Sequence, residues 1–323
     1  MRKSKCCLLV LSYNTHTHTA QVNDSQKRLT TNKKNMQMLK SHYYHKILHA
    51  VNLHFVSNTE VMVSTSRDDV LEDALADCWP TKKYAIIVPG WRESCNTSWT
   101  IELREKLIAN RGGCIICMDY RDYNEDYGFL LVNFKTIANL LTDKLKVLRE
   151  LAFDSSSSYL FGFSFGARLI AKAATDLGTK QIGTIHLCEP AGPGFDGLRN
   201  ADPKMAAVHS QCIHTASGGY GTRERTCHQN WNMGNCGESQ IGQRPFPLGN
   251  HGLCPVFYIS AFDNVFAAVK KTEACQQPIN ERDAINLPHN QTIRMGYYQN
   301  VSSMIDLNET NLYAITSRDP PFN

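Results

Sequence analysis

The chain has 323 residues, 42% of them hydrophobic, and a formal net charge of +4 at pH 7. This length fits one large domain or two small ones, and the apolar content is sufficient for a sizeable core. The charge is too small to indicate a nucleic-acid surface, and no apolar stretch reaches the roughly 20 residues that cross a bilayer.

The first 45 residues do not resemble a folded domain. Residues 1–20 carry a basic start and a short apolar core, Cys6 to Leu11, which is shorter than the usual core of about 7–15 residues and indicates a weak signal peptide. Residues 21–45 are polar and basic and are expected to form a leader. No linker rich in Pro or Gly follows, so residues 46–323 are predicted to form a single domain.

Strand-like and helix-like segments then alternate along the chain. Residues 84–88 ("YAIIV") predict a buried strand. A helix follows, with Trp99, Leu103 and Leu107 on one face, and ends at Gly112-Gly113. Residues 114–120 ("CIICMDY") predict the next strand.

The alternation continues through the middle of the chain. A long helix carries apolar residues from Phe134 to Leu148 on one face, a strand covers residues 158–161, and a second helix runs from Ser164 to Gly178. Residues 182–187 predict a fourth strand. This order predicts an α/β fold with a mostly parallel central sheet and helices on both faces.

The chain has twelve cysteines, and the crowding of six of them from Cys188 to Cys275 indicates an oxidising compartment. Cys114 and Cys117 have the spacing of a zinc knuckle, but they lie inside a predicted strand and no second such pair follows, so disulfides or buried thiols are favoured and no metal is expected. The acceptor pattern for N-glycosylation occurs at Asn23, Asn96, Asn290, Asn300 and Asn308. We therefore predict a secreted, extracellular glycoprotein.

Ser164 lies in a G-x-S-x-G pattern between a predicted strand and a predicted helix. In that context the serine occupies a sharp turn that exposes its Oγ, and Gly162 and Gly166 allow the strand and helix to pass closely. An ordinary glycine-rich turn is the alternative. The combination of motif and context favours a catalytic nucleophile.

A serine nucleophile needs a histidine to accept its proton and a carboxylate to orient that histidine, in the chain order serine, acid, histidine. Glu189, at the end of the next strand, is the favoured acid, with Asp196 and Asp202 as competitors. Spacing alone leaves the histidine open. His251 is favoured because it precedes an apolar helix in a glycine-flanked loop, and the other candidates are His186, His209, His214 and His228.

Several segments in order resemble the pancreatic-type (neutral) lipase family of α/β-hydrolases, especially its secreted insect members. The resemblance covers roughly residues 46–323 and rests on "IIVPGWRES", "GFSFGARLIA", "CEPAGPGFDG", "CIHTASGG", "GNHGLC", "MGYY" and "LYAITSRDPPF". "MGYY" and the closing segment resemble the last strands of the family.

The resemblance implies the catalytic residues Ser164, Glu189 and His251, and makes His214 structural. It also implies an oxyanion hole formed by the backbone N–H groups of Trp91 and Phe165. The chain departs from the family at two positions. Glu189 replaces the usual Asp, so a longer side chain has to fold back toward the histidine, and Pro89 replaces the usual His, which removes a side-chain hydrogen bond from the oxyanion segment.

The same resemblance places a lid before the catalytic histidine. Only residues 237–250 separate Cys236 from His251, which implies a short lid with Cys236 and Cys254 as a flanking disulfide. Short lids in the family accompany sn-1-specific phospholipases, and long lids accompany triglyceride lipases. No C-terminal β-sandwich domain is expected, and no cofactor.

Two functions from different classes follow. The first is a secreted serine hydrolase acting on phospholipid or acylglycerol esters at a membrane or lipoprotein surface. The second is a catalytically impaired homologue that binds or stores lipid, as yolk proteins do. Ser164 favours the first, whereas Glu189 and Pro89 favour the second. A dinucleotide-binding oxidoreductase is excluded because no G-x-G-x-x-G follows the first strand. The sequence leaves the oligomeric state open.

Overall fold

The computed structural model describes residues 51–56, 62–65, 81–120, 126–198, 201–242, 249–275, 293–298 and 311–323. All of them belong to one compact unit, Ile47–Asn323. The expectations for residues 1–45 lie outside this range, as do four of the glycosylation acceptors. The fifth acceptor, Asn96, is exposed.

The described residues form a nine-stranded sheet in the order β2-β1-β4-β3-β5-β6-β7-β8-β9. β1 runs antiparallel to both of its neighbours, and all pairs from β4 to β9 are parallel. The strands are β1 (Asn52–Val56), β2 (Met62–Thr65), β3 (Tyr84–Val88), β4 (Cys114–Asp119), β5 (Tyr159–Phe163), β6 (Ile182–Cys188), β7 (Ala207–His214), β8 (Gln229–Met233) and β9 (Asn311–Ala314).

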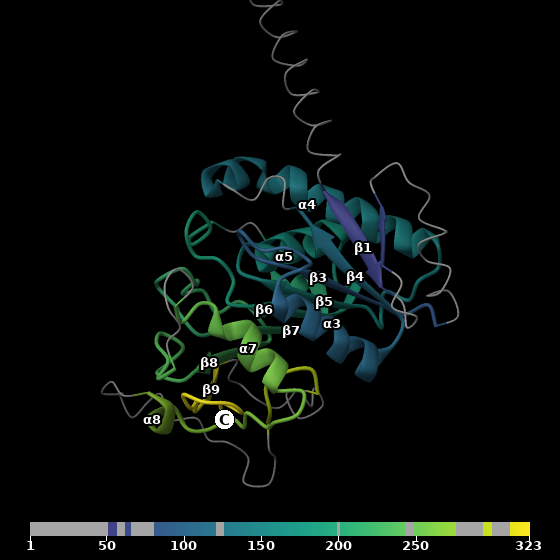
Figure 1. Cartoon of the computed structure of the whole chain (residues 1–323). Coiled ribbons are helices and arrows are strands. Elements are labelled where there is room, and N and C mark those ends of the chain that lie inside the picture. Colours follow the sequence, from purple (N-terminus) through teal and green to yellow (C-terminus); the bar gives the residue numbers. More distant parts are fainter. Residues whose placement is uncertain are drawn as a thin grey trace, which may run out of the picture. The chain divides into compact units, whose positions relative to one another are not determined.

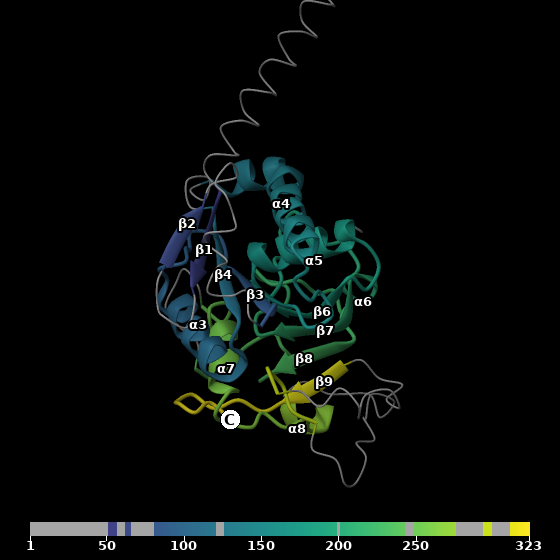
Figure 2. The same cartoon turned by 90° about the vertical axis from the view of Figure 1, so that its right-hand side faces the viewer.

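Helices cover both faces of this sheet. α4 (Tyr127–Glu150) and α5 (Phe165–Leu177) lie together on one face, and α3 (Ser98–Arg111) and α7 (Leu253–Ser260) lie on the other (Figures 1 and 2). Two short helices, α6 (Pro203–Ala206) and α8 (Lys271–Ala274), complete the described set. The predicted α/β fold with a mostly parallel sheet is confirmed.

Two separate hydrophobic cores result from this layering. Along β3, Tyr84, Ile86 and Val88 pack in the core under α4 and α5. Ala85 and Ile87 pack in the core under α3 and α7. All five side chains are buried, because successive residues of a strand point to opposite faces and both faces are covered.

The segment "MGYY" does not form the strand that the family resemblance implied. Residues 295–298 form a bend and a turn, and the preceding Arg294 makes an isolated bridge with Ala267. Gly296 has a φ of 106°, outside the extended region, so a regular strand cannot continue through it. The closing segment does contribute β9.

Four disulfides lie wholly within the described residues: Cys95–Cys117, Cys188–Cys254, Cys212–Cys227 and Cys236–Cys275. The predicted pair of Cys236 with Cys254 is therefore wrong. Cys254 lies at the start of α7, where its Cα is 5.7 Å from the Cα of Cys188 at the end of β6. This separation falls inside the narrow range that a disulfide requires.

Cys114 and Cys117 do not form a zinc knuckle. Cys117 is bonded to Cys95, and Cys114 is also disulfide-bonded. Neither sulfur is therefore available as a thiolate ligand. Among the described helices, none has the combination of length and apolar character that crossing a membrane requires.

Candidate active site

Ser164 occupies the sharp turn between β5 and α5. Its φ of 55° is unusual for a residue with a side chain and indicates a backbone held by its surroundings. Its N–H donates to the carbonyl oxygen of Cys188 at 3.0 Å, which attaches the turn to the end of β6. Phe163 packs in the α3–α7 core and Phe165 in the α4–α5 core, so the serine lies between them.

The two glycines of the motif lie where neighbouring backbone leaves no room. A Cβ on Gly166 would come within 2.2 Å of the carbonyl oxygen of Val88. One on Gly162 would come within 2.7 Å of the backbone of Ala167. Real Cβ atoms do not approach so closely, so any larger residue at these positions would push α5 away from the sheet.

His251 meets the serine. Its Nε2 lies 2.9 Å from Ser164 Oγ, although 87 residues separate the two in sequence. The imidazole ring packs against Phe163 and Tyr220, at centroid distances of 4.9 and 5.8 Å. Burial lowers the pKa of His251 to about 3. The ring is therefore neutral at physiological pH and can accept a proton from the serine.

Glu189 is fully buried directly after β6. Its Oε2 accepts hydrogen bonds from the backbone N–H and the hydroxyl of Thr215 and from the backbone N–H of Ala216. Burial raises its pKa to about 7, and the hydrogen bonds from Thr215 and Ala216 oppose part of that rise. The carboxylate is thus anchored on the end of β7.

The structure does not join Glu189 to His251 by a hydrogen bond. Glu189 Oε1 and His251 Nδ1 are both buried, and neither has a hydrogen-bond partner among the described residues. The additional methylene of Glu189 carries its carboxylate toward Thr215 and Ala216 instead of folding back to the histidine. The expectation that the glutamate side chain folds back toward the histidine is therefore not met in this structure.

Two features nevertheless bring the acid and the histidine into one neighbourhood. A Cβ on Gly221 would lie 1.7 Å from Glu189 Oε1, so this backbone covers the free carboxylate oxygen, while the adjacent Tyr220 packs against the His251 ring. The Cys188–Cys254 disulfide joins the residue before Glu189 to the first turn of α7, just beyond His251.

The competing acids have other roles. Asp196 Oδ1 pairs with Arg168 at 3.2 Å and accepts a hydrogen bond from the Thr222 hydroxyl. Asp202 caps α6 by accepting hydrogen bonds from the N–H groups of Lys204 and Met205. Both carboxylates are thus engaged away from His251.

The competing histidines do not line the cavity at Ser164. His186 is fully buried and its Nδ1 lies within hydrogen-bonding distance of the Tyr159 and Tyr258 hydroxyls. His228 Nδ1 lies 2.8 Å from Ser210 Oγ. His214 is fully buried, and burial places its pKa well below the usual value. These three, and the half-buried His209, are not among the described residues that line the cavity at Ser164.

Ser164 and His251 open into a cavity of about 330 Å³. Most of its wall is aromatic or aliphatic, which suits an apolar acyl chain. The lining residues are Trp91, Arg92, Tyr127, Phe163, Ser164, Ala191, Pro193, Tyr220 and His251. Residues 243–248, part of the predicted short lid, lie outside the described residues.

A model of the lipase family ("Lipase") matches residues 12–247. The chain belongs to the lipase family. Lipase member H of Danio rerio is 27% identical over 161 residues, which are 48% of this chain and 35% of that protein. The match therefore spans about a third of that relative's length.

Solved structures of α/β-hydrolases also match, at low similarity. A phospholipase/carboxylesterase from Dyadobacter fermentans has a TM-score of 0.35 and 14% identity over 44% of this chain and 70% of its own. An alpha-beta serine hydrolase homologue from Coxiella burnetii has a TM-score of 0.31 and 18% identity over 48% of this chain and 64% of its own.

The segment with the predicted oxyanion donor connects β3 to α3 in this lipase-family chain. Pro89, the departure from the family pattern, accepts a hydrogen bond from the Tyr120 hydroxyl through its carbonyl oxygen, at 2.6 Å. Gly90 N–H donates to Glu93 Oε2 at 2.9 Å. Side chains thus hold this segment despite the proline. Glu93 was not singled out from the sequence, because an acid in a polar turn normally faces solvent.

Phe165, the other predicted donor, is the first residue of α5. N–H groups in the first turn of a helix have no partner within that helix, so they are available to an oxygen atom of a substrate. Trp91 lines the cavity beside Ser164. Both predicted donors therefore belong to segments that border Ser164.

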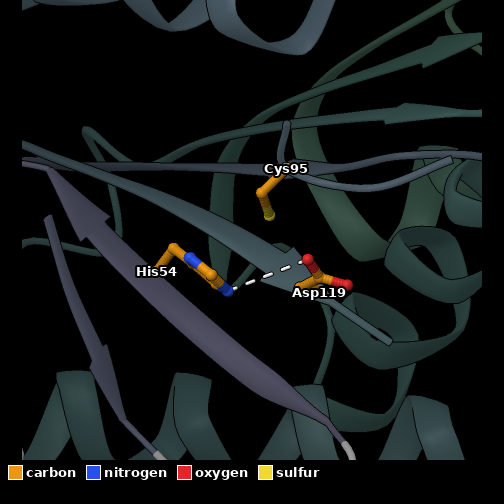
Figure 3. Close-up of side chains that lie close together, drawn as sticks. All are labelled: His54, Cys95 and Asp119. Carbon is orange, nitrogen blue, oxygen red and sulfur yellow. Dashed lines mark ion pairs between the residues drawn. The ribbon is translucent and has the colours of Figure 1, made fainter. Parts of the chain in front are cut away.

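One group of potential metal ligands lies outside this site. His54, Cys95 and Asp119 lie close together, and Figure 3 shows the His54 ring directed toward the carboxylate of Asp119. His54 Nε2 is 3.8 Å from Asp119 Oδ2. Because Cys95 is bonded to Cys117, it offers no thiolate, and two ligands remain, fewer than a structural zinc site uses.

The close approach of Glu189 to Gly221 predicts that the stability lost on substituting Gly221 depends on the side chain at position 189. Gly221→Ala should destabilise the protein by about 1–3 kcal/mol, because the new methyl group overlaps the carboxylate. In a Glu189→Asp background the shorter side chain withdraws from this space, so the same substitution should cost clearly less. Urea unfolding of the four variants measures both costs.

Gly219→Ala is the matched control in the same loop, because a Cβ there meets its nearest atom at 3.5 Å, an ordinary contact. An equal cost of Gly221→Ala in the wild-type and Glu189→Asp backgrounds would show that the carboxylate does not occupy this space.

The raised pKa of Glu189 predicts a pH-dependent stability. An exposed glutamate titrates near 4.5 and folded Glu189 near 7, so the folded state holds the proton more tightly. The stability that this neutral carboxyl contributes is present below about pH 4.5 and is lost as pH rises through about 7. Relative to the wild type, Glu189→Gln should therefore gain stability across this window. Urea unfolding at several pH values tests this, and a constant difference between the two proteins would contradict it.

Proposed function

We propose that the protein is a secreted serine hydrolase that cleaves carboxylic esters of lipids through an acyl-enzyme on Ser164. The observation that carries the proposal is the 2.9 Å contact between Ser164 Oγ and His251 Nε2 at the wall of an apolar cavity. Membership of the lipase family supports the ester chemistry. The disulfides support secretion, because such bonds persist in oxidising compartments.

In the proposed reaction, His251 Nε2 takes the hydroxyl proton while Ser164 Oγ attacks the ester carbonyl carbon. The carbonyl oxygen becomes negative and is stabilised by the N–H groups of Trp91 and Phe165. The tetrahedral intermediate collapses, and the alcohol leaves with the proton from His251. A water molecule then attacks the acyl-enzyme by the same route and releases the fatty acid.

In this proposal Glu189 supports the histidine through its free oxygen. Oε1 accepts the Nδ1–H of His251, while Oε2 keeps its hydrogen bonds to Thr215 and Ala216. A buried polar atom without a partner costs about 1–3 kcal/mol, so a movement that pairs these two atoms is favourable. Glu189 Oε1 lies against Gly221 and the His251 ring packs against the adjacent Tyr220, which supports their mutual approach.

The missing hydrogen bond also favours a second candidate, a catalytically impaired lipase homologue that binds or stores lipid. In that case the cavity would hold an acyl chain without turnover. The two candidates differ in the reactivity of Ser164, since binding a lipid requires no activated serine.

Ser164 should therefore react with a fluorophosphonate probe, and the wild type should hydrolyse a short-chain ester. Ser164→Ala should abolish labelling and reduce turnover by several orders of magnitude, because no other atom can form the acyl-enzyme. A folded wild type that neither labels nor turns over, yet binds a fluorescent fatty acid, would establish the second candidate. Phospholipid and triacylglycerol substrates, compared at equal surface area, then distinguish the ester class.

Glu189→Ala should lower ester turnover by about 10³–10⁴-fold, as the loss of the acid does in other serine hydrolases. Asp196→Ala is the matched control, because its carboxylate binds Arg168 and Thr222 instead. Turnover that depends on Asp196 and not on Glu189 would overturn the assignment of the acid.

A further inference from the structure

A buried carboxylate lies in the segment between β3 and α3. Glu93 is 9% exposed, and each of its oxygens accepts a hydrogen bond. Oε2 accepts from the backbone N–H of Gly90 at 2.9 Å, and Oε1 accepts from the indole Nε1–H of Trp99 at 3.0 Å. Both partners are N–H groups that can only donate.

Gly90 lies between this carboxylate and the nucleophile. A Cβ on Gly90 would come within 3.1 Å of Glu93 Oε2 and within 3.1 Å of Ser164 Cβ. The Glu93 carboxylate therefore holds the peptide that passes directly beside Ser164. The next peptide N–H along the chain is that of Trp91.

Trp99, the side-chain partner of the Glu93 carboxylate, is held by packing in the core. Trp99 lies in the first turn of α3, is 8% exposed, and packs on Phe161 and Phe163 at centroid distances of 5.9 and 5.8 Å. On the other side of the segment, the Tyr120 hydroxyl donates to the carbonyl oxygen of Pro89. The short turn is thus attached to α3 at one end and to the end of β4 at the other.

We propose that Glu93 is a positioning residue for the oxyanion hole: its carboxylate, held by the Trp99 indole, fixes the Gly90–Trp91 backbone so that the Trp91 N–H faces the reacting carbonyl oxygen. The inference rests on the proposed hydrolase function. It assigns to Glu93 a role in the rate of the chemical step and none in substrate binding.

The chemistry of the two donors makes this role specific to a carboxylate. A carboxylate accepts at both oxygens, whereas a glutamine amide accepts at one oxygen and donates at its nitrogen. In Glu93→Gln the amide NH₂ has to face either Gly90 N–H or Trp99 Nε1–H, so two donors oppose each other. Trp99→Phe removes one of these donors, and the glutamine oxygen is then free to accept from Gly90.

Burial raises the pKa of Glu93 to about 7. Assays at about pH 8.5 therefore examine the ionised form, which accepts both hydrogen bonds. At this pH, Glu93→Gln should lower kcat for a soluble ester by about 10- to 100-fold. This decrease is no larger than the decrease in kcat that follows removal of one oxyanion-hole donor. KM should change by less than about twofold, because the interaction acts in the transition state.

The deciding variant is the double substitution. Glu93→Gln with Trp99→Phe should have a higher kcat than Glu93→Gln alone, although it carries one more change in the core. A residue that only supported folding would show further loss instead. A kcat of Glu93→Gln equal to that of the wild type, or a double variant at or below the single one, would overturn the proposal. Urea unfolding of each variant shows that the compared proteins are folded.

A second readout does not depend on turnover. The chain has four tryptophans, so a ¹⁵N-tryptophan-labelled sample gives a small set of indole N–H signals, and Trp99→Phe assigns one of them. That signal should move upfield in Glu93→Gln, because the charged acceptor is replaced. An unmoved signal would show that the carboxylate does not hold the indole. If the wild type has no esterase activity, the proposed function and this catalytic role fail together, whereas the indole signal still decides whether the hydrogen bond exists.

Discussion

The close approach of α5 to the end of β3 is the constraint on which the site depends. Gly166 allows the first turn of the helix to touch the backbone of Val88 and Pro89, two residues after Ser164 makes the sharp turn with its positive φ of 55°. The same contact brings the start of the Pro89–Glu93 segment next to Ser164. The serine and the proposed oxyanion segment are thus positioned by one backbone contact, and no side chain larger than hydrogen is compatible with it.

The layering of the fold and the nucleophile turn could be predicted from the sequence because both are local. The strand at residues 84–88 is continuous in sequence, and Ser164 has its glycines within two positions on either side. The sequence leaves several histidines open as the partner of Ser164, because the contact with His251 spans 87 residues and no local pattern encodes it. The family resemblance supplied what spacing alone left open.

The features that sequence reasoning missed depend on long-range geometry. Cys254 pairs with Cys188 and not with Cys236, because the relevant distance is set by how α7 packs beside β6. The direction of the Glu189 carboxylate depends on the donors at Thr215 and Ala216 and on the open space at Gly221. Glu93 was missed because the sequence around it does not show that Trp99, in the first turn of α3, donates a hydrogen bond to its carboxylate.

The two hydrophobic cores have a consequence for how this chain tolerates amino-acid substitutions. The side chains of the α3–α7 core and of the α4–α5 core belong to separate clusters, with Phe163 in one and Phe165 in the other. The effects of substitutions in the two cores on stability are therefore expected to be nearly additive. Ser164 lies between Phe163 and Phe165, so the turn that carries it depends on the packing of both cores.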